Sequence, residues 1–138
     1  MSEHENLQIV RDTYAAFGRG DIPALLEHVD EYVEWEAVIG AAPHVPTAGK
    51  RVGKNMVKEF FQILGETVEF DVFEAEEFVA QDNLVVVLGR YSGRAKGTGR
   101  AFAERWAMAM TVQHGKIVRF REYVSTSAID AAFDPVRV

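Results

Sequence analysis

Several features are missing from this sequence, and each absence excludes a class of function. The chain of 138 residues has no cysteine, which excludes a disulfide, a thiolate metal site and a cysteine nucleophile. Its four histidines show no spacing typical of metal ligands, so we expect no metal site. It has no excess of basic residues, because 15 Lys and Arg stand against 21 Asp and Glu and give a net charge of −6. A protein that follows a nucleic-acid backbone needs a basic surface, so we expect no nucleic-acid partner.

Long apolar runs are also missing. No stretch approaches the length that crosses a membrane, so we expect no membrane partner. Residues 2–5 are polar and acidic, whereas a signal peptide needs a basic start and an apolar run. We therefore expect a cytoplasmic protein. With 48% hydrophobic and 26% charged residues, the composition is typical of a globular protein, and the length predicts one domain over residues 1–138.

Helical signals dominate the first 64 residues. A capping box of Ser2 and Glu5 predicts the start of a first helix, and Gly18 and Gly20 predict its end. Asp21 caps a predicted second helix. Residues 55–64 predict a third, with apolar side chains at helical spacing.

Between the second and third helices, residues 32–38 alternate between apolar and polar side chains. This period of two predicts a strand with Trp35 on its apolar face. Residues 39–53 are rich in glycine and proline and predict a loop longer than most connections. Such a loop is either a binding loop or a plain connector.

Period two continues from residue 66 onward. It predicts four strands, over residues 66–80, 84–94, 100–112 and 116–126. After Ser127, the sequence predicts one helical turn before Pro135. Helices followed by a run of strands predict an α+β fold.

Two carboxylates interrupt apolar rows on the last two predicted strands. Glu122 is the single carboxylate on the even face of the final strand, and Glu104 is the single one on the bulky face of the preceding strand. A carboxylate on an apolar wall either reaches solvent or pairs with an arginine, here Arg90 or Arg94, or it is desolvated. A desolvated carboxylate has a raised pKa and can move a proton at neutral pH.

The turn between these strands sets their register. A three-residue turn over 113–115 places Trp106 opposite Glu122 and makes Glu104 and Glu122 diagonal neighbours, about 7–8 Å apart. Two neighbouring carboxylates push their pKa values apart, which gives one acid and one base. A two-residue turn would instead place the two carboxylates on opposite faces.

Five motifs spread over nearly the whole chain carry the most specific information about the fold. They lie at residues 14–17 (YAAF), 20–26 (GDIPALL), 33–36 (VEWE), 53–61 (GKNMVKEFF) and 114–123 (HGKIVRFREY). Together they resemble the SnoaL-like branch of the nuclear-transport-factor-2-like superfamily, which includes the ketosteroid isomerases. The resemblance implies a cone-shaped roll in which three N-terminal helices pack on a strongly curved, mostly antiparallel sheet that encloses a pocket.

The resemblance also implies roles for single residues. The acid/base aspartate of SnoaL-type polyketide cyclases aligns with Glu122. The carboxylate base of the ketosteroid isomerases would fall at or beside Ala37, so the match argues against a steroid isomerase. The branch contains isomerases, cyclases, hydratases and proteins without an assigned function, so it is specific for the fold rather than for the reaction.

We therefore predict a pocket protein for a small hydrophobic molecule, with Glu122, Glu104 and Tyr14 as candidate catalytic residues and with no cofactor. The candidate ligand-binding residues are Trp35, His44, Phe61, Trp106, Met108 and Phe120. The activity would be acid/base catalysis of the isomerase, cyclase or hydratase class on a small hydrophobic carbonyl or polyketide-like substrate. The alternatives are a non-catalytic binder of hydrophobic ligands and a dimeric protein-association domain.

We also expect a homodimer. The odd face of the last two strands combines small alanines with an aromatic and three arginines, as an interface would. These larger side chains are Arg105, Arg119, Arg121 and Tyr123.

Overall fold

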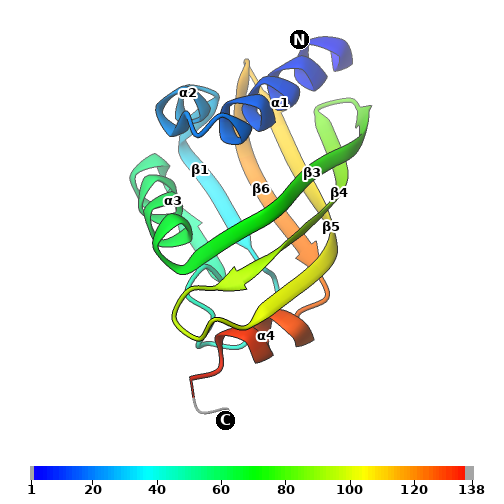
Figure 1. Cartoon of the computed structure of the whole chain (residues 1–138). Helices are drawn as coiled ribbons and strands as arrows, with labels where there is room; N and C mark the ends of the chain where they lie inside the picture. Colours follow the sequence, from blue (N-terminus) through cyan, green and yellow to red (C-terminus); the bar gives the residue numbers. More distant parts are fainter. Residues whose placement is uncertain (1, 136–138) are drawn as a thin grey trace.

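Three helices and two strands come first in the chain, and four further strands and a short helix follow. The structure is a computed structural model that describes residues 2–135 (Figure 1). Its helices are α1 (Glu3–Gly18), α2 (Ile22–Glu27), α3 (Lys54–Thr67) and α4 (Ser127–Phe133). Its strands are β1 (Val29–Ala37), β2 (Gly49–Val52), β3 (Val68–Gln81), β4 (Leu84–Ala95), β5 (Ala101–Gln113) and β6 (Lys116–Val124). The predicted α+β fold with three N-terminal helices is confirmed.

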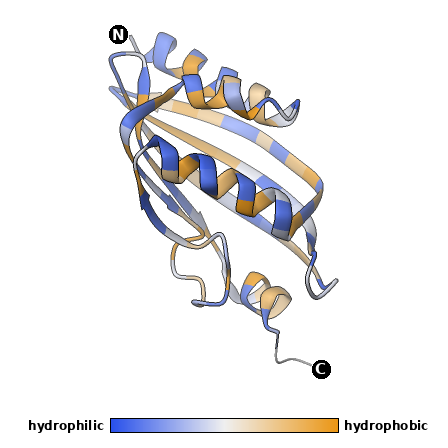
Figure 2. Ribbon diagram, turned by 90° about the vertical axis from the view of Figure 1, so that its left-hand side faces the viewer, coloured by the Kyte–Doolittle hydropathy of each residue, from blue (hydrophilic) through white to orange (hydrophobic). Residues whose placement is uncertain are grey.

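The first two helices begin directly after the capping residues that the sequence predicts, Ser2 and Asp21. The Ser2 side chain accepts the backbone N–H of Glu5, and the Glu5 carboxylate accepts the backbone N–H of Ser2, so the capping box is complete. The Asp21 side chain accepts the backbone N–H of Ala24 at the start of α2. Hydrophobic and hydrophilic residues alternate along the helices in Figure 2, as expected of helices with one buried face. None of the described helices is both long and apolar enough to cross a membrane.

The six strands form one sheet in the order β2-β1-β6-β5-β4-β3. Neighbouring strands are antiparallel, except that β1 and β6 are parallel. The last strand therefore lies inside the sheet, between β1 and β5. Fully buried side chains from five different elements meet between the helices and the sheet, and they include Val10, Val33, Val57, Val85 and Ile117.

Two glycines let β3 pass close to β4. A Cβ atom at Gly89 would lie 2.2 Å from the carbonyl oxygen of Glu74, and one at Gly93 would lie 2.2 Å from that of Glu69. The register of β3 also shifts twice in this region. Such irregularities increase the local twist of a strand, and Figure 1 shows β3 running obliquely across the sheet, on the same side as the helices.

The hairpin between β5 and β6 differs from our prediction. Its turn has two residues, His114 and Gly115, with φ values of 52° and 78°, as in a type I′ turn. The shorter turn alone would place the even residues of the two strands on opposite faces. A register shift between Thr111 and Val112 brings them back to the same face. Glu122 still faces inward, but it lies opposite Met108 instead of Trp106.

Three boundaries also differ from the sequence prediction. The first strand begins at Val29, three residues earlier than predicted. The predicted loop over residues 39–53 contains β2, which pairs with β1. The tail forms the seven-residue helix α4 instead of a single turn.

Candidate functional site

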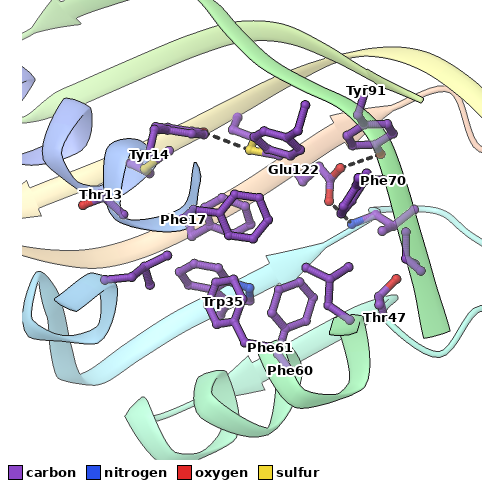
Figure 3. Close-up of a pocket in the computed structure, with 18 of the residues that line it drawn as sticks. Thr13, Tyr14, Phe17, Trp35, Thr47, Phe60, Phe61, Phe70, Tyr91 and Glu122 are labelled. Carbon is purple, nitrogen blue, oxygen red and sulfur yellow. Dashed lines mark hydrogen bonds between the residues drawn. The ribbon is translucent and has the colours of Figure 1, made fainter. Parts of the chain in front are cut away.

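A cavity of about 90 Å³ lies between the helices and the inner face of the sheet. Side chains from all four helices and from five of the six strands line it, and half of these residues are aromatic. Figure 3 shows rings from α1, α3 and several strands gathered around it. Among the described residues, Glu122 is the one charged side chain in the lining. This volume is smaller than the cavity of about 150 Å³ that holds benzene, so a molecule of one ring fits only when the lining side chains shift outward.

Glu122 is buried and held by two hydrogen bonds. Its side chain is 5% exposed. Its Oε1 atom accepts the backbone N–H of Val38 at 3.1 Å, and its Oε2 atom accepts the hydroxyl of Tyr91 at 2.7 Å (Figure 3). Burial raises the pKa of Glu122 above its ordinary value of 4.5, and the two hydrogen bonds offset this shift only in part. The carboxyl group is therefore a stronger base than an exposed glutamate.

Two tyrosine hydroxyls face the same cavity. Burial raises the pKa of Tyr91, and the negative charge of Glu122 raises it further. Burial and the same charge also raise the pKa of Tyr14. Both hydroxyls therefore keep their protons and act as donors, Tyr91 to Glu122 and Tyr14 to the Sδ atom of Met108 at 2.9 Å.

The donor residue Val38 has an unusual backbone. Its φ is +44°, in the left-handed region that β-branched residues rarely adopt. The following residue, Ile39, donates its N–H to the main-chain oxygen of Glu122 at 3.2 Å. Glu122 therefore holds the start of the 38–48 loop through both its side chain and its backbone. Strained residues of this kind cost about 1–3 kcal/mol and are concentrated at functional sites.

Comparison with known families identifies the fold family. The profile of the SnoaL-like domain matches residues 10–120. This chain belongs to the SnoaL-like domain family. A crystal structure of an NTF2-like protein from Burkholderia xenovorans is 40% identical, with a TM-score of 0.86 over 97% of this chain and 99% of that one. An NTF2-like protein from Burkholderia thailandensis is 30% identical, with a TM-score of 0.83 over 98% and 100% of the two chains. An uncharacterized protein of Mycobacterium tuberculosis is 26% identical over 137 residues, which are 96% of this chain and 98% of that protein.

Six of the predicted site residues of this SnoaL-like domain line the cavity. They are Tyr14, Trp35, Phe61, Met108, Phe120 and Glu122. They come from α1, β1, α3, β5 and β6, so the fold brings together side chains from across the sequence.

The predicted pairing of Glu104 with Glu122 is wrong. Glu104 is half-buried, lies opposite Tyr91 and does not line the cavity. It stands four residues along β5 from Met108, the residue opposite Glu122, which is about 13 Å of strand. The error follows from the register of the hairpin, which the prediction placed two residues away.

The other two predicted residues also lie outside the cavity lining. His44 is exposed, and its Nε2 atom forms a hydrogen bond of 2.7 Å with the main-chain oxygen of Asp130 in α4. Trp106 is buried beside the cavity, where its ring stacks on Tyr14 at 6.0 Å between centroids. It supports a lining residue rather than forming part of the wall.

An arginine partner for Glu122 is contradicted by the structure. Arg90 and Arg94 instead form ion pairs with acidic side chains of β3, at positions that are about half exposed. These partners are Glu69, Asp71, Glu74 and Glu76. The actual partners of Glu122 are Tyr91 and the Val38 backbone. Tyr91 could have been found from its position in the inward row of β4, but the Val38 N–H has no signature in the sequence.

Proposed function

We propose that this SnoaL-like domain binds a small hydrophobic molecule with a carbonyl group and moves a proton on it, as isomerases, cyclases and hydratases do. The observation that carries the proposal is the buried Glu122 carboxyl, with its raised pKa, in an aromatic cavity. None of the ion pairs in the described part of the chain involves it. Burial of such a group costs free energy, and general-base catalysis is a reason to maintain it.

In the proposed step, the ionised Glu122 takes a proton from the carbon next to the carbonyl group. The electron pair of the broken C–H bond forms an enolate, and the negative charge moves to the carbonyl oxygen. The proton on Glu122 exchanges with solvent, and Glu122 then returns a proton, or in D₂O a deuteron, to the same or to another carbon, so no cofactor is needed. A raised pKa favours the first half of this cycle, because it makes the carboxylate a stronger base. Tyr91 and the Val38 N–H position the carboxyl group.

Acetophenone is a suitable probe, because it has one ring and an enolisable methyl group. We expect the protein to accelerate exchange of these methyl protons in D₂O above the buffer rate, as measured by proton NMR. Glu122→Gln should exchange at the buffer rate, because an amide cannot accept the proton. Glu104→Gln is the matched control and should exchange like the wild type. Exchange by Glu122→Gln at the wild-type rate would refute the proposal.

A non-catalytic binder of hydrophobic ligands is the second candidate. The lining favours it, since it offers many apolar rings and few polar groups. The same experiment separates the two functions. A binder would bind acetophenone in both the wild type and Glu122→Gln and would accelerate exchange in neither.

A further inference from the structure

The indole N–H of Trp35 is a further polar group in the wall of the cavity. Trp35 is 4% exposed and lines the cavity, and its Nε1 atom has no hydrogen-bond partner among residues 2–135. Buried donors in folded proteins are nearly always paired, and an unpaired one costs stability. A donor of this kind in the wall of a ligand cavity therefore points to an acceptor on the ligand.

The surrounding rings fix the position of this donor. The indole of Trp35 stacks on Phe120, with 3.9 Å between ring centroids and 16° between ring planes. Phe60 and Phe61 each lie 5.7 Å from it. In Figure 3, the indole nitrogen lies on the edge of the ring toward the middle of the lining side chains. Because three aromatic rings pack against the indole, it cannot turn freely to find a protein partner.

Trp35 and Glu122 are close neighbours on the same inner face. Trp35 lies beside Phe120 in the parallel pair of β1 and β6, and Glu122 is two residues further along β6. The strand spacings place their Cα atoms about 8 Å apart. One small molecule can therefore contact the indole N–H and the carboxyl group at the same time.

We infer that the Trp35 N–H donates a hydrogen bond to the carbonyl oxygen of the ligand, while Glu122 faces the adjacent carbon. This inference rests on the proposed function and narrows its substrate class to a neutral ketone or aldehyde on a compact hydrocarbon frame. An anionic ligand would bring a second negative charge next to Glu122, at a high cost in a buried site. When the proton is removed, negative charge develops on the carbonyl oxygen, so the hydrogen bond from Trp35 strengthens in the transition state.

The second tryptophan provides a matched control. The Nε1 atom of Trp106 is also buried without a partner among the described residues, but Trp106 does not line the cavity. Replacement of either tryptophan by phenylalanine keeps an aromatic ring and removes the N–H. Only the Trp35 change should affect recognition of a carbonyl group.

The test uses two ligands of the same shape, acetophenone and α-methylstyrene, which carries a CH₂ group in place of the oxygen. We expect Trp35→Phe to bind acetophenone roughly 5- to 10-fold more weakly than the wild type, the effect of one hydrogen bond. Its affinity for α-methylstyrene should change by less than about twofold. Trp106→Phe should bind both ligands like the wild type. Calorimetric titration gives the six dissociation constants of the three proteins for the two ligands.

A second measurement is made on the wild-type protein, and the variants serve only to assign its signals. The chain has two tryptophans, so the wild type has two indole N–H signals in a ¹⁵N–¹H spectrum, which the two variants assign. The Trp35 signal should move downfield with acetophenone and less with α-methylstyrene. The Trp106 signal should respond equally to both ligands. Equal shifts of the Trp35 signal with the two ligands would overturn the inference.

Other outcomes separate this inference from the proposed function. If Trp35→Phe weakens both ligands equally, the indole serves only in packing and the inference is wrong. If Tyr91→Phe, but not Trp35→Phe, selectively weakens acetophenone, the carbonyl group lies at Tyr91 and the inference is again wrong. If the Trp35 effects are found but methyl exchange is not accelerated, the inference holds and the catalytic function fails. If neither ligand binds the wild type, both fail.

Discussion

Replacement of Glu122 by glutamine should make the protein more stable at pH 8 and leave its stability nearly unchanged at pH 4. The pKa of Glu122 is higher in the folded state than its ordinary value of 4.5. Below that ordinary value the group is neutral in both the folded and the unfolded state. As the pH rises toward the folded pKa, the unfolded state ionises first and the folded state loses stability. Glutamine has no charge, so the variant avoids this loss.

The magnitude follows from the pKa difference and the hydrogen bonds. Each unit by which the folded pKa exceeds the unfolded pKa removes about 1.4 kcal/mol of wild-type stability at high pH. Glutamine has the same shape, so its amide oxygen can accept the Val38 N–H and its NH₂ group can donate to the Tyr91 hydroxyl. At pH 4 we therefore expect the two proteins to differ by less than about 1 kcal/mol in free energy of unfolding.

Urea unfolding followed by tryptophan fluorescence between pH 4 and 8 measures this difference. Tyr91→Phe should show a steeper loss of stability with pH than the wild type, because it removes the hydrogen bond that holds the pKa of Glu122 down. Tyr123→Phe makes the same chemical change at an exposed position and should behave like the wild type. If the stability of Glu122→Gln relative to the wild type falls, or stays constant, as the pH rises, the carboxylate is not destabilised by burial and the reasoning is refuted.

Three further predictions concern packing and assembly. Gly89→Ala should lower the free energy of unfolding in urea by about 3 kcal/mol or more, because the new Cβ would lie 2.2 Å from a main-chain oxygen of β3 and 2.3 Å from an indole ring of β5. Gly97→Ala is the control, because a Cβ there has no atom within 4 Å, and it should leave the stability unchanged. Gly65→Ala, also with open space around it, should raise the stability of α3 by about 0.5–1 kcal/mol in a thermal melt. We predict a homodimer through the outer face of the sheet, where Leu88 is 40% exposed. Sedimentation should show a dimer for the wild type and a monomer for Leu88→Glu. A wild-type monomer at micromolar concentration would contradict the prediction.

The elements that period and caps determine could be predicted from the sequence. The capping box of Ser2 and the switch to period two near residue 66 gave the order of helices and strands. The inward direction of Glu122 also followed from period two, because its apolar neighbours on the same face must be buried. Such features depend on residues close together in the chain.

The register of the last hairpin could not be predicted in the same way. A histidine can adopt the left-handed conformation, so the turn closes over two residues, and a register shift within the strands compensates. The sequence alone gives no sign of that register shift, and for this reason the predicted pairing of Glu104 with Glu122 was wrong. The Val38 N–H was missed because a valine with positive φ contradicts the local preference of that residue and is held by tertiary contacts.

The place of β6 inside the sheet has a consequence for the order in which the protein folds. β6 is the last strand to be synthesised, yet β1 and β5 are joined only through it. Until β6 is available, β1 can pair only with the four-residue β2. The aromatic side chains of β1 and those of β3 to β5 then lie on separate pieces of sheet. Pairs as distant in sequence as Trp35 and Phe120 make folding slow, because a long loop must close before they form. A nascent chain therefore exposes the rings of the later cavity until β6 has been added.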